Sequence, residues 1–133
     1  MATETVYLDI ETTNPGGYAT ATTTPTSSTT YYYQFTGGTD QKGNVDVTTE
    51  KDNTEINISL HANSNGPYDL IDATPKTDNS NGDITVTSNT PNKITITDKA
   101  EVNNVEMTYT VNAKPKGTTD LKIHCDPRVK NNW

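Results

Sequence analysis

Period-2 alternation is the feature that most limits what this chain can fold into. Eight short runs place an apolar residue at every second position, which is the spacing of a β-strand with one buried face. No long window shows the i, i+3, i+4, i+7 spacing of an amphipathic helix, so the sequence predicts an all-β protein. The runs are Val6-x-Leu8-x-Ile10, Tyr31-x-Tyr33-x-Phe35, Val45-x-Val47, Ile56-x-Ile58-x-Leu60, Ile84-x-Val86, Ile94-x-Ile96, Val105-x-Met107-x-Tyr109-x-Val111 and Leu121-x-Ile123-x-Cys125.

Threonine and asparagine support the same fold class. Of the 133 residues, 27 are threonine and 15 are asparagine. Threonine is β-branched and suits a strand, and its hydroxyl can hydrogen-bond with water on the solvent-exposed face of a sheet. Asparagine, glycine and proline cluster between the apolar runs, where they favour turns. This rhythm predicts an immunoglobulin-like antiparallel β-sandwich of about seven to nine strands.

Two segments leave alternatives open. Residues 16–30 are rich in Thr, Ala and Ser, and they form either a mobile loop or a weakly apolar edge strand through residues 18–24. We favour the strand, because Thr-rich runs have high β propensity and structureless loops of this length are uncommon. Residues 68–73 are apolar without alternating, which fits a short edge strand or a covering loop.

The length fits a single domain, residues 1–133, with one modest core. Hydrophobic residues make up only 29% of the chain, so disorder is the competing interpretation. Disordered chains combine low hydrophobicity with high net charge, whereas a formal charge of −7 is modest and the apolar residues stand in register. We therefore expect a folded domain with a thin core and a polar surface.

The charge balance argues against two classes of partner. With a pI near 4.6 and ten dispersed Lys and Arg residues, the chain lacks the basic patch that nucleic acids or anionic membranes require. No stretch has the apolar length of a membrane-spanning helix, and the first residues lack the basic and apolar parts of a secretory signal. The single cysteine suits a reducing compartment. We expect a cytoplasmic protein.

Nucleophilic catalysis has little support. His124 and Cys125 are neighbours on a predicted strand, so their side chains point to opposite faces and cannot form a dyad. His61 reaches Cys125 only if tertiary contacts bring them together. We interpret Cys125 as a small buried hydrophobe. There is no Gly-x-Ser-x-Gly elbow, and we expect no enzymatic activity.

Aromatic residues raise the alternative of carbohydrate binding. Most aromatic residues are tyrosine, with seven, and there is one tryptophan, so the aromatic rings carry O–H or N–H groups that can form hydrogen bonds. In the Tyr31-Tyr32-Tyr33 run at least one ring faces outward, which makes Tyr32 a candidate ligand-binding residue together with Trp133. In the competing interpretation, Tyr31 and Tyr33 support the core with Phe35, and Tyr32 merely covers the outer sheet.

Calcium is the one cofactor with a cue in the sequence. Acidic and amide side chains cluster at residues 50–53 and 78–83, and we name Asp52, Asp78 and Asp83 as weak candidate ligands. The second cluster does not follow the EF-hand spacing. Asp and Asn are also ordinary residues of exposed turns, so both interpretations stay open. Two histidines and one cysteine fall short of a zinc site.

The C-terminal segment reads Asp126-Pro127-Arg128-Val129-Lys130-Asn131. This ending resembles the tail of the bacterial DP-EP family, and the bacterial inclusion-body proteins of PixA and AidA type end similarly. The resemblance covers six residues and implies an immunoglobulin-like sandwich with no established enzymatic activity. The tail also predicts a latch: Pro127 ends the preceding strand, Val129 returns to the core edge and Asp126 pins the turn.

Two functional hypotheses follow. The first is a non-catalytic interaction or structural module of a bacterial cytoplasm that self-associates by pairing edge strands. The segments Val45-Asp46-Val47 and Ile84-Thr85-Val86 are the candidate edges. The alternative is a carbohydrate-binding, lectin-like module that works either with or without calcium.

Overall fold

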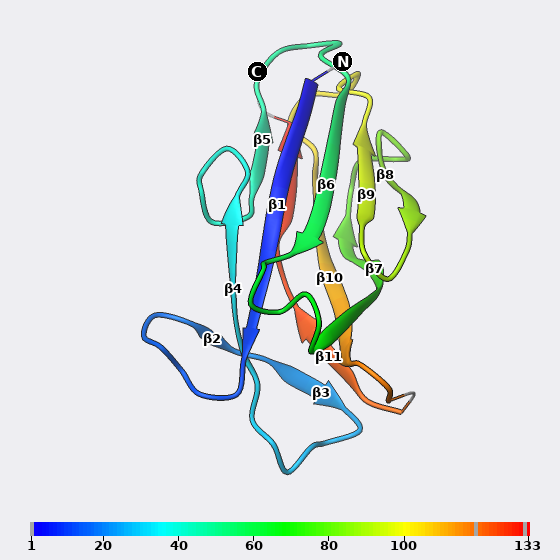
Figure 1. Ribbon diagram of the computed structural model, residues 1–133. Coiled ribbons are helices and arrows are strands. Elements are labelled where there is room, and N and C mark those ends of the chain that lie inside the picture. Colours follow the sequence, from blue (N-terminus) through cyan, green and yellow to red (C-terminus); the bar gives the residue numbers. More distant parts are fainter. Residues whose placement is uncertain (1, 119, 132) are drawn as a thin grey trace.

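Two β-sheets packed face to face confirm the predicted all-β sandwich (Figure 1). The computed structural model describes residues 2–118, 120–131 and 133, and this part contains no helix. A membrane-spanning helix is accordingly not found among these residues. In spatial order, sheet A contains β2 (Ala19–Thr20), β4 (Tyr32–Gly37), β1 (Ala2–Glu11), β6 (Thr54–Leu60), β9 (Ile94–Asp98) and β8 (Ile84–Asn89).

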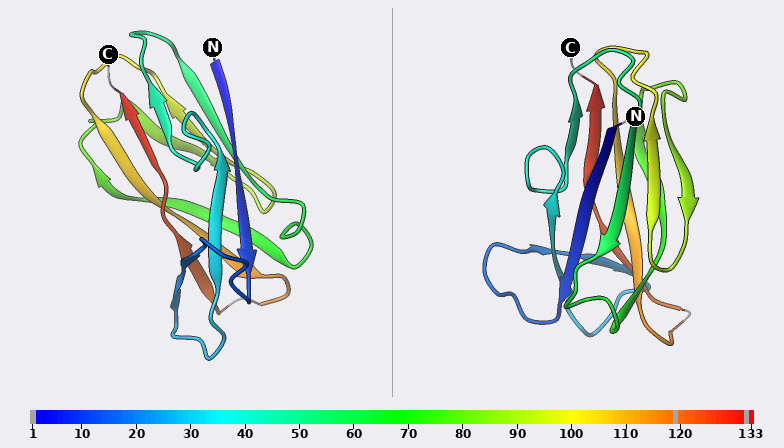
Figure 2. Two further views of the ribbon diagram at one scale, coloured as in Figure 1. Left: turned by 90° about the vertical axis from the view of Figure 1, so that its left-hand side faces the viewer. Right: turned by 45° about the horizontal axis from the view of Figure 1, so that its top comes forward.

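Sheet B is built around its central strand, β10. On one side β10 pairs with β7, and on the other it pairs with β11 and then β12 (Figure 2). Beyond β11 lies β3, and beyond β12 lies β5. The bounds in sheet B are β3 (Thr22–Thr24), β5 (Val45–Val47), β7 (Tyr68–Asp78), β10 (Glu106–Pro115), β11 (Lys122–Cys125) and β12 (Arg128–Asn131).

The described residues form twelve strands rather than seven to nine. Each of the eight alternating runs falls on a strand, and the additional strands come from three places. Residues 18–24 contribute two short strands, β2 and β3, in place of the single strand we favoured. The undecided segment that begins at Tyr68 is the long edge strand β7, and the C-terminal segment forms β12.

Both sheets are mixed rather than wholly antiparallel. Strand β1 runs parallel to β6, and β12 runs parallel to β5. The first case follows from the path of the chain: after β4 the chain crosses to sheet B as β5 and then returns to sheet A beside β1. β4 is antiparallel to β1, and the connection through β5 reverses the direction of the chain once more, so β6 runs in the direction of β1.

The core lies where the alternation predicts it. Leu8 on β1, Ile58 on β6 and Met107 on β10 are all fully buried, and each occupies an alternating apolar position. Cys125 is also fully buried, which confirms that it packs as a small hydrophobe. Burial, followed by the nearby charge of Asp126, raises the pKa of the Cys125 thiol well above its usual range. The thiol is therefore inert in the folded protein.

The connection between β4 and β5 is a tight polar turn. Desolvation alone would raise the pKa of Asp40, but hydrogen bonds from the Asn44 side chain and the Lys42 and Asn44 backbone lower it below 3.8. Gly43 has a φ of +86°, and a Cβ added there would lie 2.2 Å from Cβ of Phe35. Only glycine fits this close approach of the turn to the core.

The two predicted edge segments are edge strands. β5 ends the strand order of sheet B, and β8 ends that of sheet A. On β5, Asp46 accepts a hydrogen bond from Nη1 of Arg128 at 2.7 Å, which places a charged pair on the edge. The pairing of β8 with β9 shifts between Val86 and Ser88, so β8 carries a bulge. Charges and bulges both discourage unwanted strand addition.

The C-terminal segment returns to the sandwich as a strand, β12. Strand β11 ends at Cys125 and β12 begins at Arg128, so Pro127 interrupts the strand where it was expected to. Val129 is fully buried in the core, and the carbonyl of Pro127 accepts the N–H of Tyr109 at 3.2 Å. Asn131 is fully buried as well. The tail is thus an integral strand of sheet B.

Candidate ligand-binding grooves around Asp126

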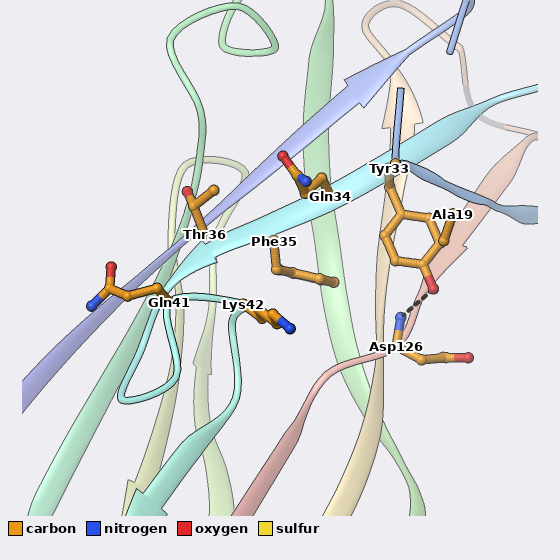
Figure 3. Close-up of a pocket in the computed structure, with 9 residues that line it drawn as sticks. Ala19, Tyr33, Gln34, Phe35, Thr36, Gln41, Lys42 and Asp126 are labelled. Carbon is orange, nitrogen blue, oxygen red and sulfur yellow. Dashed lines mark hydrogen bonds between the residues drawn. The ribbon is translucent and has the colours of Figure 1, made fainter. Parts of the chain in front are cut away.

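Asp126, the residue between β11 and Pro127, lines three surface hollows in the described part of the chain, and the two with the larger volumes are the candidate grooves. The first, which we call the aromatic groove, has a volume of about 460 Å³. It lies where β4 of sheet A faces the β11–β12 junction of sheet B, and Asp126 forms part of its wall (Figure 3). The side chains that define it are Tyr33, Phe35, Lys42 and Asp126.

The wall of the aromatic groove is formed by two rings of β4. Tyr33 and Phe35 meet edge to face, with ring centroids 5.8 Å apart and an interplanar angle of 76°. Phe35 is buried, whereas Tyr33 is half-buried. Figure 3 shows Tyr33, Phe35 and Lys42 on the side of β4 that faces Asp126, while Gln34 points to the other side. Tyr33 is therefore the ring that a ligand in this groove meets.

The Tyr33 hydroxyl is tied to the Asp126 backbone. The N–H of Asp126 donates to Oη of Tyr33 at 3.4 Å, a long hydrogen bond (Figure 3). Desolvation raises the pKa of Tyr33 and the hydrogen bond from Asp126 lowers it, with a net increase. The hydroxyl consequently keeps its proton at neutral pH and remains available as a donor.

The second hollow, which we call the polar groove, lies on the outer face of sheet B and has a volume of about 420 Å³. Four strands, β3, β7, β10 and β11, contribute to it, together with Asp126. Every lining residue is polar or charged. They are Thr22, Thr74, Lys76, Thr110, Asn112, Lys122, His124 and Asp126.

A row of hydrogen bonds passes through two lining residues of the polar groove, His124 and Asn112. Oγ1 of Thr24 lies 2.8 Å from Nε2 of His124, and Nδ1 of His124 lies 2.6 Å from Oδ1 of Asn112. Nδ2 of Asn112 donates to Oδ1 of Asp72 at 2.6 Å. Because the Asp72 carboxylate only accepts, Asn112 must present its oxygen to His124. This assigns the imidazole proton to Nδ1 and leaves Nε2 to accept from the Thr24 hydroxyl.

The row arises from strand register. Asp72, Asn112 and His124 are direct cross-strand partners on β7, β10 and β11, and Thr22 on β3 is the next partner in line. The order hydroxyl, imidazole, amide also occurs in hydrolase triads. Here the sheet places Asp72, Asn112 and His124 directly opposite one another, whereas Thr24 is a diagonal neighbour of His124, because its own register partner is Lys122. We therefore interpret the row as cross-strand side-chain pairing. Its effect is to hold several polar groups in fixed orientations.

Asp126 links the two grooves. Its Oδ1 accepts the hydroxyl of Thr110 at 2.8 Å, and its Oδ2 lies 3.5 Å from Nζ of Lys76. Pro127 places it there by ending β11, so the carboxylate stands at the rim rather than continuing the strand. The Asp-Pro pair of the sequence is thus a structural device that brings one carboxylate to both hollows.

The two aromatic candidates from the sequence line neither groove. Tyr32 pairs with Glu11 of β1 and with Thr20 of β2, on the opposite face of β4 from Tyr33. Trp133 packs against the core, and its backbone N–H and carbonyl are held by the Asn103 side chain at 2.9 and 2.6 Å. The ring that does line a groove is Tyr33, which the alternation assigned to core support, and Tyr33 does pack against the core.

The calcium candidates occupy three different environments. Asp52 is exposed in the turn before β6, and Oδ1 of Asp78 accepts the N–H and hydroxyl of Ser80 at 2.8 and 2.6 Å. Asp83 is buried, and both of its oxygens accept the N–H of Glu101. Across residues 2–118, 120–131 and 133, no three His, Cys, Asp or Glu side chains gather as a metal site.

No protein-family model matches this chain, and no curated protein matches it significantly in sequence. The grooves are therefore interpreted from their own residues. They combine a tyrosine ring, oriented amide and hydroxyl groups, and several charges, a set that suits a ligand with both C–H faces and many hydroxyls.

Proposed function

We propose that this chain is a non-catalytic interaction module that binds an oligosaccharide in the grooves around Asp126. The observation that supports this most is the placement of the Tyr33 ring beside a shared carboxylate and a row of oriented polar groups. A sugar ring offers an apolar C–H face to an aromatic side chain and hydroxyls to the threonine hydroxyl, ammonium and carboxylate groups that line the grooves.

Preorganisation favours binding at this surface. Asn112 is only 4% exposed, and its amide is fixed by both His124 and Asp72. A ligand therefore does not have to order these side chains, which removes part of the entropic cost of association. A groove lined by freely rotating polar side chains would lack this advantage.

The proposal is tested by thermal melts with a panel of oligosaccharides, followed by calorimetric titration of those that raise the melting temperature. We expect Tyr33→Ala to weaken binding about tenfold or more, in line with the loss of one aromatic contact. Tyr7→Ala is the matched control, because Tyr7 is 43% exposed on the outer face of sheet A. If no sugar shifts the melting temperature, the proposal fails.

Two further arms belong to this experiment. Repeating the titration with calcium and with EDTA tests whether the module is calcium-dependent, which the sequence leaves open. Hydrolysis of an activated ester tests the non-catalytic part of the proposal, because Thr24 lies within hydrogen-bonding distance of His124. Turnover that disappears in Thr24→Ala would show that the hydroxyl acts as a nucleophile.

Self-association through β8 is a second candidate function. β8 is the six-residue edge of sheet A, and in the described part of the chain only β9 pairs with it. Its bulge lies between Val86 and Ser88, so the regular part that could pair with a second copy is residues 84–86. β5 is a weaker candidate, since it has three residues and carries the Asp46–Arg128 pair. Light scattering at rising concentration tests this idea. Thr85→Lys at the β8 edge should abolish a dimer that Thr5→Lys, on the central strand β1, leaves intact.

We also propose that the domain is an immunoglobulin-like sandwich related to the bacterial DP-EP family and resident in the cytoplasm. The support is that Pro127, Val129 and Asn131 of the shared tail each have a definite place in the fold, as strand terminator and as buried side chains. A solved family member whose matching Asn side chain was exposed rather than buried would count against the relationship. Fractionation of the source cells tests the location.

A further inference from the structure

We infer that the ligand is an acidic oligosaccharide, carrying carboxylate groups, that runs through both grooves and crosses Asp126. This inference rests on the proposed function and specifies its ligand class. It has two parts, the charge of the ligand and its length, and each is carried by a separate observation.

The charge follows from the lysines that line the grooves. Lys42 lines the aromatic groove, while Lys76 and Lys122 line the polar groove, and Asp126 is the single acidic residue among the lining side chains. The chain as a whole has a formal charge of −7. A local excess of cations on an acidic protein creates a positive hollow that attracts anions. The rest of the surface is negative and offers anions few other binding sites.

These cations are available to a ligand. Within the described residues, the ammonium groups of Lys42 and Lys122 make no salt bridge. Lys76 lies 3.5 Å from Asp126, with the two side chains 63% and 45% exposed, so this pair contributes little and can open. Three cations are thus free, or easily freed, to meet carboxylates.

The length follows from the position of Asp126. It belongs to the lining of both hollows, its backbone N–H is directed at Tyr33, and its Oδ1 is held by Thr110 in the polar groove. A linear ligand that stacks on Tyr33 and continues past this residue reaches His124 and Asn112. The Asp126 carboxylate then accepts sugar hydroxyls at the crossing and separates the lysines of the two grooves.

The test is calorimetric titration of the intact protein with four probes: an oligogalacturonate tetramer, galacturonate monomer, a neutral cello-oligosaccharide tetramer and polyglutamate. We expect the acidic tetramer to bind at least about tenfold more tightly than the neutral tetramer or the monomer, and to lose affinity as salt rises. Lys42→Gln and Lys122→Gln should each weaken it severalfold. Lys93→Gln, in the exposed turn between β8 and β9, should not.

The possible outcomes distinguish failure of this inference from failure of the proposed oligosaccharide binding. If the neutral tetramer binds as tightly as the acidic one, the charge assignment is overturned while the oligosaccharide function stands. Equal affinity for monomer and tetramer overturns the two-groove path. Equal affinity for polyglutamate shows that the surface recognises anions of any kind, which overturns the sugar assignment. Binding of no saccharide at all removes the proposed function itself.

Discussion

Nδ2 of Asn131 lies 2.8 Å from Oδ2 of Asp83, which ties the last residue of β12 to the turn that precedes β8. The same nitrogen lies 3.2 Å from Oδ1 of Asp98, and all three side chains are buried. In the described part of the chain, Oδ2 of Asp98 and Oδ1 of Asn131 have no hydrogen-bond partner. Two carboxylates in one desolvated site depend on the few donors that reach them.

Removing this amide should be costly. Asn131→Ala deprives Asp83 and Asp98 of a shared donor without removing either carboxylate, and we expect a loss of about 3 kcal/mol in the free energy of unfolding. Urea denaturation at neutral pH measures it. Asn53→Ala is the control, because Asn53 is exposed and its side chain makes no hydrogen bond in the described structure; its effect should stay within about 0.5 kcal/mol. Equal effects would refute the role of Asn131.

The carboxyl of Asp98 should make stability depend on pH. Burial raises its pKa above 3.8, against the opposing hydrogen bonds from Ala100 N–H and Asn131, and the charge of Asp83 raises it further. A carboxyl with a raised folded-state pKa stabilises the fold fully below its unfolded pKa, and this contribution is lost as the pH rises through the folded pKa. Asp98→Asn cannot ionise, so its stability relative to the wild type should increase as the pH rises from about 4 towards 8. A flat difference across this range would contradict the assignment.

Cys125 should be unreactive until the protein unfolds. Its side chain is fully buried and its pKa is raised, so both access and thiolate are lacking. We expect its reaction with a disulfide reagent to be at least about a hundredfold slower in buffer than in urea. Ser28→Cys provides a reference thiol, because Ser28 is exposed, and this variant should show one fast and one slow thiol. A fast wild-type reaction would mean that the strand carrying Cys125 opens readily.

Gly43 and Gly117 form a matched pair for measuring a steric clash. Both have a φ of +86°, so an alanine suffers the same backbone strain of about 1 kcal/mol at either position. At Gly117 an added Cβ meets nothing within 4 Å, whereas at Gly43 it lies 2.2 Å from Cβ of Phe35. Gly43→Ala should therefore be less stable than Gly117→Ala by about 2 kcal/mol or more in chemical denaturation. Similar losses would show that the turn moves away from Phe35 at little cost.

The sequence predicts the core well, because a strand with one buried face shows an apolar residue at every second position. Leu8, Ile58 and Met107 are fully buried, and each could be placed from its neighbours two residues away. The break at Pro127 was likewise predictable, because a proline lacks the N–H that a strand requires. Position on an edge was also foreseen for β5 and β8.

The candidate site could not be predicted in this way, because it depends on partners distant in sequence. Asn112 and His124 look like ordinary outward-facing positions until β10 and β11 are paired in register. Tyr33 shares the inward face of β4 with Phe35, and it lines a groove together with Asp126, which is distant in the sequence. The sequence left Asp83 open between a weak calcium ligand and an exposed turn residue, whereas in the fold it is buried and accepts backbone N–H groups from the β9–β10 connection. The alternation of apolar residues along one strand does not show which residues of other strands and loops will contact it.

The passage from β2 to β3 takes a single residue, Ala21, and places neighbouring threonines in different layers. One short ribbon thereby shields the flank of β4 and the flank of β11 together. Deleting this ribbon would expose unpaired backbone N–H and C=O groups on both β4 and β11. The shortened protein should then pair these strands with strands of other copies and aggregate. The threonine-rich stretch thus covers one flank of each sheet with a single short segment.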